Sequence, residues 1–387
     1  MAVQLEADRS AKASQRGARV FPVDALRGLI MTLMAIDHAN IFVAQKHSPG
    51  EYWGGSFPVY YDALAFLTRL VTHPCAPGFF LLMGVGMVLF ARSRRAQGWS
   101  EGNILGHLWV RGALLVALQL LVVNRAWASS PGGWPPKVYI GVLFALGGSM
   151  ILGSLLLRWR PTRLLLLTLV LFAGTELLHP DPSMWARIPI SGVNRINLLL
   201  MRPGGDTRLW SNYPVLPWLE LVTFGMVFGH WLLEDARRAS DRAWKIGLAL
   251  LVVFVAVRYV DGFGNIRPRA GNSWIDFLNV VKYPPSMVFT LLTTGVNLIL
   301  LALLARATGI WQRLVQPLAV FGQVPLLFYL AHLFLYATLG ALLTPDGTSL
   351  AAMYAVWFLG LVVLYPLCLW YGRLKQGQTA RSILRFF

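Results

Sequence analysis

The sequence predicts an all-α, polytopic integral membrane protein, a bundle of about ten transmembrane helices with both termini in the cytoplasm. Its 387 residues are 56% hydrophobic and only 13% charged, with a mean hydropathy of +0.57, which is far more apolar than soluble proteins usually are. The formal charge is +17, but the basic residues fall in short clusters between apolar runs and form no nucleic-acid-binding module. We therefore expect a lipid bilayer around the chain and no nucleic-acid partner.

A helix that crosses the hydrocarbon core of a membrane needs roughly 20 apolar residues. The chain offers about ten such runs, near residues 21–44, 62–90, 108–124, 138–157, 164–178, 214–233, 246–260, 285–304, 317–343 and 351–371. The first run carries charged residues and has no clear small-residue cleavage site, so we expect it to remain as the first helix and not to be removed as a signal peptide. An even number of spans places both ends of the chain on one side.

Lysine and arginine are enriched in cytoplasmic loops, and their distribution predicts the orientation. Here 20 of the 34 basic residues lie at the two ends of the chain and in alternate loops, which places both termini in the cytoplasm. We expect a polar tail over residues 1–19, a single transmembrane domain over 20–372 and a basic tail over 373–387. Cys75 and Cys368 both lie in apolar runs, so neither a disulfide framework nor a CxxC metal site is expected.

The ionisable residues of the first run, RGLIMTLMAIDH, indicate a functional role, because each costs roughly 2.5–3.5 kcal/mol at the centre of a membrane helix. Arg27 and His38 are about three helical turns and about 16 Å apart, so they share one face at different depths. Asp24 lies three residues before Arg27 and is expected to pair with it. The alternative is that Arg27 snorkels and His38 marks the far interface.

This face suits a long cytoplasmic ligand with an anionic head and a thin arm, and acyl-coenzyme A has that shape. Arg27 would bind phosphate or pantetheine. His38, oriented by Asp37, would remove a proton from the acceptor or carry the acyl group transiently. We expect Arg27 and His38 to line a single passage, and we expect no metal.

The second run adds Asp62, Arg69 and His73, whose spacing places them on one helix face. They are expected to orient His38 or to contact the ligand, and the alternative is a structural pair of Asp62 with Arg69. The motif THPCAPG that follows Val71 contains two prolines, which predict a break that frees backbone groups at membrane depth. Such backbone is tolerated where it lines a cavity.

A polar stripe of Tyr329, His332 and Tyr336 runs along the very apolar motif FYLAHLFLY. Tyr329 and His332 are candidates for contact with the substrate or with CoA. A buried histidine whose hydrogen bonds are satisfied is the alternative.

Two long extracytoplasmic loops are expected, near residues 179–213 and 261–284. Their Trp, Asn, Asp and Arg residues suit a sugar, because aromatic faces pack on the apolar surfaces of sugar rings while amides and charges bind hydroxyls. The alternative is an aromatic belt at the membrane interface.

The motif R-x10-H, which begins in VDALRG, resembles the signature of the acyltransferase 3 family and of the wider superfamily of transmembrane acyltransferases. Further blocks follow, namely DH at the end of the first helix, RLVTHPCAPGFFLLMG, SNYPVLPWLELVTFGMVFG, KYPPSMVFTLLTTG and FGQVPLLFYLAHLFLY. In this order they resemble the bacterial relatives of the heparan-alpha-glucosaminide N-acetyltransferase catalytic domain. The single motif R-x10-H is a weak signal, whereas blocks in family order across essentially the whole chain are specific.

The resemblance implies a multi-helix enzyme of a bacterial inner membrane that takes an acetyl group from its co-substrate, cytoplasmic acetyl-CoA, and delivers it to a saccharide or glycan on the far side. It implies that Arg27 binds the CoA end and that His38 is catalytic. In the eukaryotic pattern the catalytic histidine lies in the luminal segment after the first helix, where His47 is the nearest counterpart here, so both histidines are candidate bases. The acceptor, the length of the acyl group and the formation of a homo-oligomer stay open.

Two other classes of function are alternatives. A transporter or flippase would line its path with the same charges and move an intact solute without CoA, although no paired broken helices mark corresponding halves of the sequence. A haem-binding electron carrier would use His38, His73 and His332 as axial ligands.

Overall fold

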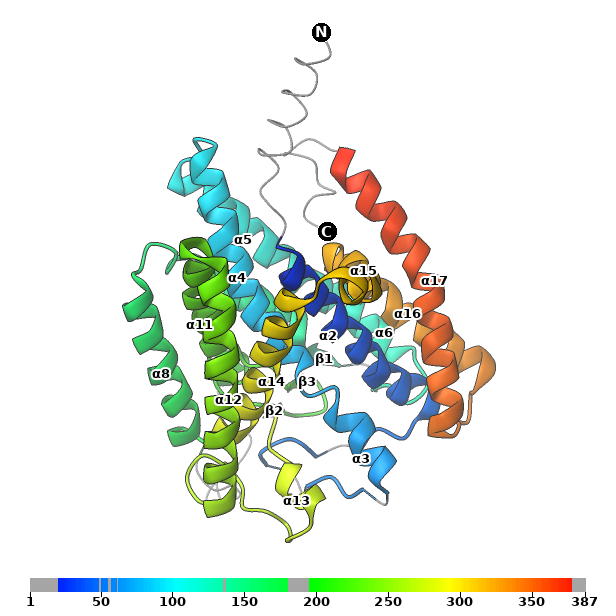
Figure 1. Ribbon diagram of the computed structural model, residues 1–387. Helices are drawn as coiled ribbons and strands as arrows, with labels where there is room; N and C mark the ends of the chain where they lie inside the picture. The colour runs from blue at the N-terminus through cyan, green and yellow to red at the C-terminus, as the bar shows by residue number, and fades with distance from the viewer. Residues whose placement is uncertain are drawn as a thin grey trace.

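The computed structural model describes residues 20–48, 50–54, 57–60, 62–134, 137–179 and 195–377, and these ranges are mostly helical (Figure 1). The helices are α2 (Phe21–Ala39), the π-helical turn η1 (Asn40–Ala44), α3 (Ala63–Leu70), α4 (Cys75–Ala96), α5 (Glu101–Leu118), the π-helical turn η2 (Gln119–Val123), α6 (Asn124–Ala128), α7 (Val142–Ser154), α8 (Pro161–Leu177), α10 (Arg195–Leu200), α11 (Val215–Glu234), α12 (Ala236–Val260), α13 (Trp274–Leu278), α14 (Met287–Arg306), α15 (Gly309–Gln323), α16 (Pro325–Leu343) and α17 (Leu350–Gly377). Three short strands, β1 (Val138–Ile140), β2 (Gly204–Gly205) and β3 (Leu209–Ser211), form one small sheet in the order β1–β3–β2.

Eight helical segments of the described ranges are long and apolar enough to cross a membrane. They are Phe21–Ala44, Ala63–Ala96, Glu101–Ala128, Val215–Glu234, Ala236–Val260, Met287–Arg306, Pro325–Leu343 and Leu350–Lys375, and each coincides with one of the predicted runs. The two other predicted runs form the shorter helices α7, with 13 residues, and α8, with 17. The predicted all-α, polytopic architecture is therefore confirmed.

The predicted run near residues 317–343 is divided between two helices. Helix α15 ends at Gln323, and α16 begins at Pro325, because proline fits the first turn of a helix but removes a hydrogen bond from its interior. Only α16 therefore has the length of a membrane span in this region.

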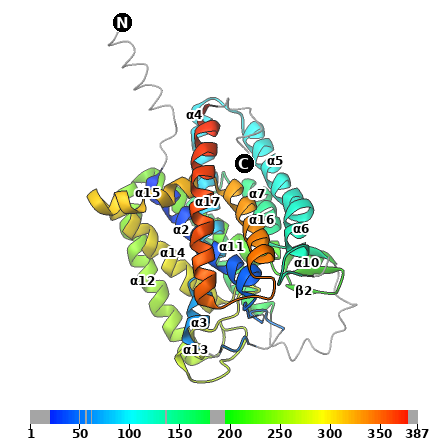
Figure 2. The ribbon, with the colours of Figure 1, turned by 90° about the vertical axis from the view of Figure 1, so that its right-hand side faces the viewer.

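Helix α2 lies at the centre of the bundle, in contact with α4, α14, α15, α16 and α17 (Figures 1 and 2). A Cβ atom on Gly28 would lie 1.7 Å from the carbonyl oxygen of Leu318, and one on Gly322 would lie 1.9 Å from that of Asp24. Glycines allow two membrane helices to approach until their backbones touch. Helix α15 therefore crosses α2 directly beside Arg27.

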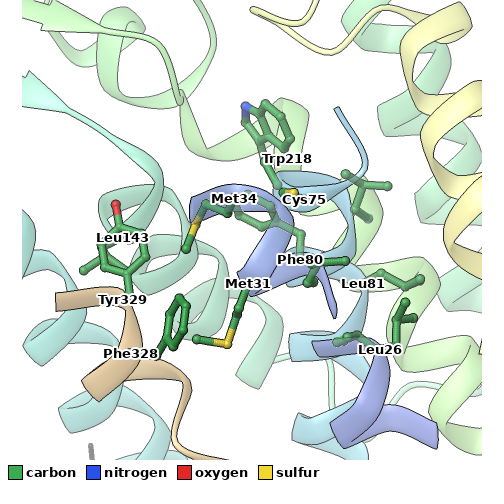
Figure 3. Packing of buried hydrophobic residues seen from close by; sticks show 14 of the residues in the cluster. Leu26, Met31, Met34, Cys75, Phe80, Leu81, Leu143, Trp218, Phe328 and Tyr329 are labelled. Carbon is green, nitrogen blue, oxygen red and sulfur yellow. The ribbon is translucent and has the colours of Figure 1, made fainter. Parts of the chain in front are cut away.

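The apolar core continues along α2 on either side of this crossing. Figure 3 shows Leu26, Met31 and Met34 of α2 among side chains of neighbouring helices, with Phe80 of α4 and Phe328 of α16. All five side chains are buried. This packing fixes the angle at which the polar residues of α2 are presented.

The second span is broken, as its two prolines predict. A turn separates α3 from α4, and its last residue, Pro74, is the N-cap of α4. At the other end of α3, Asp62 is the N-cap, where its Oδ1 accepts a hydrogen bond from the amide of Ala65 at 2.7 Å. The break places Arg69, in the last turn of α3, within reach of Asp37 on α2.

The start of α2 and the end of α17 lie at the same end of the bundle, while α3 and α13 lie at the opposite end (Figures 1 and 2). We call these the inner end and the outer end, because the distribution of basic residues predicts that the first of them faces the cytoplasm. Helix α17 continues to Gly377, past residue 372, after which the sequence predicts the basic tail. Residues 1–19 and 378–387 lie outside the described ranges.

Candidate functional site

Two cavities adjoin α2, one towards each end of the bundle. The outer cavity has a volume of about 480 Å³ and the inner cavity about 290 Å³. The outer cavity is lined, among others, by Asp37, His38, His47, Glu51, Arg69, Trp127, Trp134, Lys137, Val142, Trp210, Asn212, Tyr283 and Tyr329. Those of the inner cavity are Arg27, Arg111, Val142, Leu143, Gln323, Tyr329 and Lys375, together with further apolar side chains.

His38, near the end of α2, is hydrogen-bonded to His332 of α16. The Nδ1 atom of His38 lies 2.6 Å from Nε2 of His332, and Nδ1 of His332 lies 2.9 Å from the carbonyl oxygen of Phe328. The carbonyl can only accept, so His332 carries its proton on Nδ1, and in a neutral ring its Nε2 accepts from His38 Nδ1. This chain of bonds leaves the lone pair of His38 on Nε2, which has no hydrogen-bond partner among the described residues.

The environment of the two rings fixes the direction of that lone pair. His332 is completely buried and His38 is only 7% exposed, and His38 lines the outer cavity. Trp127 and Tyr329 pack edge-on against His38, at ring-centre distances of 5.5 and 6.4 Å. The free Nε2 of His38 is therefore held at the cavity surface as a proton acceptor.

The second candidate base, His47, lies in the loop after η1 and pairs with Asp37. Its Nε2 is 3.4 Å from Oδ1 of Asp37, and the same oxygen accepts a hydrogen bond from Nη1 of Arg69 at 2.5 Å. Both His47 and Arg69 line the outer cavity. The structure thus brings His38 and His47 into one cavity, each with its own partner.

Arg69 is 3% exposed and is shared by two carboxylates. Besides Asp37, it donates from Nε to Oε1 of Glu51 at 2.6 Å and from Nη2 to Oε2 of Glu51. Burial opposes ionisation of Glu51, but the guanidinium of Arg69 outweighs that effect and holds the pKa of the carboxyl at about 2. This network ties the loop that carries His47 to the end of α3.

The loop before α14 closes the same region from the other side. The backbone carbonyl of Glu51 accepts hydrogen bonds from the amides of Lys282 and Tyr283 at 3.0 and 3.1 Å, and the amide of Trp53 donates to Tyr283 at 2.8 Å. Lys282 is only 4% exposed, and its Nζ lies 5.2 Å from the centre of the Tyr283 ring. Burial lowers the pKa of the Lys282 ammonium to about 8, and the charge of Arg69 acts in the same direction.

Aromatic side chains from both long loops cover the outer cavity. Trp210 and Asn212 come from β3 and the residue after it, and Tyr283 comes from the second loop. Trp210 donates from Nε1 to Asn212 at 2.8 Å, and Nζ of Lys137 lies 5.3 Å from the ring of Trp134 and 5.6 Å from that of Trp210. Flat apolar faces beside amide and ammonium groups are the surfaces that a sugar ring can use.

The inner cavity combines apolar walls with cations near the inner end. Arg27 donates to Oδ1 of Asp24 at 3.0 Å, which confirms the predicted pair, and to the carbonyl oxygen of Gly322 at 2.9 Å. Arg111 and Lys375 also line this cavity, and no described residue gives Arg111 a hydrogen bond or an ion pair. A guanidinium without a counter-ion in such a place suits an anionic ligand.

Arg27 and His38 line two neighbouring cavities, where a single passage was expected. Arg27 lines the inner cavity and His38 the outer one. Two residues, Val142 at the start of α7 and Tyr329 of α16, line both cavities and form the wall between them. The shared helix face was predicted correctly, but side chains from other helices divide it.

Four predicted site residues, Asp24, Asp62, His73 and His332, line neither cavity. Asp24 pairs with Arg27, and His332 is hydrogen-bonded to His38. Asp62 caps α3 and does not join Arg69, because the helix begins after it and Arg69 is taken by Asp37 and Glu51. His73 is 3% exposed, with Nδ1 2.9 Å from the carbonyl oxygen of Arg69 and Nε2 3.4 Å from Glu51. The common face of Asp62, Arg69 and His73 is lost at the break between α3 and α4.

Several functional candidates escaped the sequence analysis, and Glu51 is the most important. It is the only acidic residue between Asp37 and Asp62, and this isolation is the signal that could have identified it as a partner of Arg69. Arg111 and Lys137 were missed because an arginine or lysine in or near a span can bind a ligand or simply snorkel to the membrane surface, and the sequence fits both interpretations equally well. Within the described ranges, no group of three His, Cys, Asp or Glu side chains is arranged to hold a metal ion.

Comparison with known families places these residues in context. Residues 19–258 match the model of the family described as heparan-alpha-glucosaminide N-acetyltransferase, catalytic. The match covers more than half of the chain and includes Arg27, His38, His47 and Arg69. A comparison with curated proteins finds no match.

Proposed function

The chain belongs to the heparan-alpha-glucosaminide N-acetyltransferase catalytic family and is thus a membrane acetyltransferase, and from this premise we propose that it carries an acetyl group from cytoplasmic acetyl-CoA to a saccharide hydroxyl or amine on the outer side. The observation that carries the proposal is the hydrogen bond between Nδ1 of His38 and Nε2 of His332, at 2.6 Å. It leaves Nε2 of His38 free at the outer cavity, close to the residues that separate this cavity from the inner one. The two cavities supply one site for each substrate.

The inner cavity supports a role in binding the donor. Its volume of about 290 Å³ is near the lower end of ligand sites, roughly 300–1,000 Å³, which suits a thin pantetheine arm better than a whole nucleotide. Arg27, held by Asp24 and Gly322, would bind the phosphates together with Arg111, which has no partner in the described part of the chain. The apolar walls beyond them would hold the arm, with the thioester pointing at Tyr329.

His38 is the proposed base. An acceptor O–H or N–H in the outer cavity attacks the carbonyl carbon of the thioester while Nε2 of His38 takes its proton, and the C–S bond breaks. The proton then passes to the sulfur of CoA, which leaves as the thiol. His332 accepts from Nδ1 of His38 throughout, so it keeps the ring in place and stabilises the imidazolium.

An acetylated His38 is the other route to the same products. In that route Nε2 attacks the thioester, CoA leaves first, and the acceptor takes the acetyl group from the ring in a second step. A single-turnover reaction with labelled acetyl-CoA, quenched before acceptor is added, separates the two routes, since only the second leaves label on the protein.

His47 and the aromatic walls are proposed to bind the acceptor. His47 lies farther along the chain towards the outer loops and is paired with Asp37, whose charge is also held by Arg69. Trp210, Asn212 and Tyr283 offer the stacking faces and polar groups that a saccharide needs. In this arrangement His38 takes the proton from the attacking atom of the acceptor, and His47 orients the acceptor.

The two alternative functions predict other geometries or other products. A haem held between two histidines needs its axial nitrogens about 4 Å apart, since each metal–nitrogen bond is about 2 Å, whereas those of His38 and His332 are hydrogen-bonded at 2.6 Å. A transporter would move the acceptor intact and would release no CoA. The experiment below distinguishes these outcomes.

The test uses the full chain in proteoliposomes, with labelled acetyl-CoA on the side of the inner end and glucosamine as a probe acceptor on the other side. We expect release of free CoA and formation of acetylated glucosamine. His38→Gln should lower the rate by about 10²–10⁴-fold, while His47→Gln should mainly raise the KM for the acceptor. His230→Gln, outside both cavities, is the matched control and should leave the rate unchanged.

Two results would overturn the proposal. Unchanged turnover in His38→Gln would remove the assigned base. Movement of glucosamine without CoA release in the wild type would favour the transporter.

A further inference from the structure

The wall between the two cavities is the feature that the proposed function does not explain. Only Val142 and Tyr329, among the described residues, line both cavities. If the donor lies on one side of this wall and the acceptor on the other, the reacting atoms meet at these two side chains. The wall therefore controls what else reaches the thioester.

Tyr329 contributes the larger part of this wall. Its ring packs edge-on against His38 and His332, at ring-centre distances of 6.4 and 5.6 Å, and it is 7% exposed. Figure 3 shows it next to Leu143, which also lines the inner cavity. The phenol hydroxyl has no hydrogen-bond partner among the described residues, so nothing there holds it to either side.

Val142 is the fixed part of the wall. It is the first residue of α7, and a β-branched side chain has little rotational freedom in a helix. Tyr329 lies in the second turn of α16, and because tyrosine has no branch at Cβ, its χ1 angle is less restricted than that of valine. The contact between donor and acceptor therefore depends on Tyr329.

We propose that Tyr329 sets the ratio of acetyl transfer to hydrolysis, by keeping the water of the outer cavity away from the thioester until an acceptor has displaced it. This inference rests on the proposed function. Exclusion of water is a general way in which transferases suppress hydrolysis. Here loop residues of the outer end line the outer cavity, and Tyr329 together with Val142 separates that cavity from the proposed donor site.

The two competing reactions differ only in the nucleophile. In transfer, the acceptor oxygen or nitrogen bonds to the acetyl carbon, the C–S bond breaks, and the acceptor proton passes through His38 to the sulfur of CoA. In hydrolysis, a water oxygen bonds to the same carbon, the same C–S bond breaks, and acetate and CoA thiol are formed, with one proton released. Since His38 serves both, its loss slows both and leaves their ratio unchanged.

The first test measures acetate and acetylated glucosamine together in the proteoliposome reaction. We expect Tyr329→Ala to raise the ratio of acetate to acetylated product by about tenfold or more, and Tyr329→Phe, which keeps the ring, to stay close to the wild-type ratio. Val142→Ala should raise the ratio in the same direction. Tyr336→Phe, on the same helix, is the control, because Tyr336 donates to the carbonyl of Trp357 and lines neither cavity.

A second test does not depend on acetyl transfer. Leu143→Cys places a thiol in the inner cavity, and a membrane-impermeant thiol reagent is added from the outer side. We expect the added thiol to react in the Tyr329→Ala background and to stay protected with Tyr329 present. Native Cys75 and Cys368 are buried, and the Tyr329→Ala variant without the added cysteine gives their background.

The two experiments separate this inference from the function on which it rests. A wild type that releases no CoA in the presence of acceptor would overturn the proposed function, whereas the thiol assay would still test the wall. The inference is overturned if Tyr329→Ala is folded and active with an unchanged product ratio, or if the added cysteine is equally reactive with and without Tyr329.

Discussion

Nδ1 of His38 and Nε2 of His332 are 2.6 Å apart, although 294 residues separate them in the chain. Nδ1 of His332 donates to the carbonyl oxygen of Phe328, so the two rings form a chain of hydrogen bonds, which we call the relay. At its other end, Nε2 of His38 lies at the surface of the outer cavity. We expect this hydrogen bond to position His38, a role for His332 that its place in an apolar helix does not by itself reveal.

The first prediction concerns this positioning role. His332→Phe keeps a flat ring but removes the acceptor for His38 Nδ1, so we expect kcat to fall by roughly 10²-fold with little change in the KM for acetyl-CoA. His332→Gln supplies an amide oxygen and should recover part of the rate. His179→Phe is the control, because His179 is also buried but lines neither cavity. Equal kcat in the Phe and Gln variants of His332 would contradict the relay.

The second prediction concerns Arg111. It lines the inner cavity and has no hydrogen bond or ion pair with the residues that the structure describes, so Arg111→Gln should remove a contact with an anionic group of the donor and little else. We expect the KM for acetyl-CoA to rise by about tenfold, because a charge-assisted hydrogen bond contributes about 1.5–3 kcal/mol. Arg158→Gln makes the same charge change at an exposed position near the inner end and should leave this KM unchanged. A KM that rises equally in both variants would point to the general surface charge.

The third prediction concerns the stability of the Arg69 network. Glu51→Gln leaves the buried guanidinium with one carboxylate, and breaking a buried pair costs about 3–5 kcal/mol. Thermal unfolding in detergent should show a marked loss of stability. Glu101→Gln breaks the exposed pair with Arg95 and should cost about 0–1 kcal/mol.

The pKa of Glu51 also predicts how the free energy of unfolding depends on pH in acid. The pKa of Glu51 is about 2 in the folded protein and 4.5 without its neighbours, so its stabilising contribution is complete above pH 4.5 and is lost as the pH falls towards 2. Glu51→Gln should lack this part of the acid dependence. A curve of the same shape in the variant and the wild type would mean that other carboxylates cause it.

The fourth prediction concerns Lys282, whose charged form destabilises the folded protein, whereas the charged form of Glu51 stabilises it. Its pKa is lowered from 10.5 to about 8, so the unfolded chain binds more protons between these values, and the free energy of unfolding should rise as the pH increases from about 8 to 10.5. Lys282→Met should flatten this rise and stabilise the protein near neutral pH. Lys245→Met, at an exposed position, should keep the wild-type slope.

The sequence predicted what depends on contacts within one helix. Arg27 and Asp24 are three residues apart on α2, so their pair required only helical geometry, and the break before α4 followed from proline chemistry. The same reasoning failed for Asp62 and Arg69. It assumed one continuous helix, whereas the helix starts at Ala63 and uses Asp62 as its cap.

Contacts between distant segments were beyond the reach of the sequence. His38 and His332 were both identified as candidates, but their hydrogen bond depends on how α16 packs against α2. Glu51 reaches Arg69 only because its loop pairs with the backbone of Lys282 and Tyr283. The division of the expected passage by Tyr329 likewise depends on the approach of α7 and α16.

The exchange across the wall at Tyr329 has an electrical consequence. In the proposed reaction the acetyl group leaves the sulfur of CoA for the outer side while a proton moves from the acceptor to that sulfur, so a neutral thioester becomes a neutral thiol and a neutral acceptor becomes a neutral ester or amide. No net charge crosses the insulating layer in a turnover. The membrane voltage should therefore neither drive nor oppose acetylation, and the thioester alone supplies the free energy.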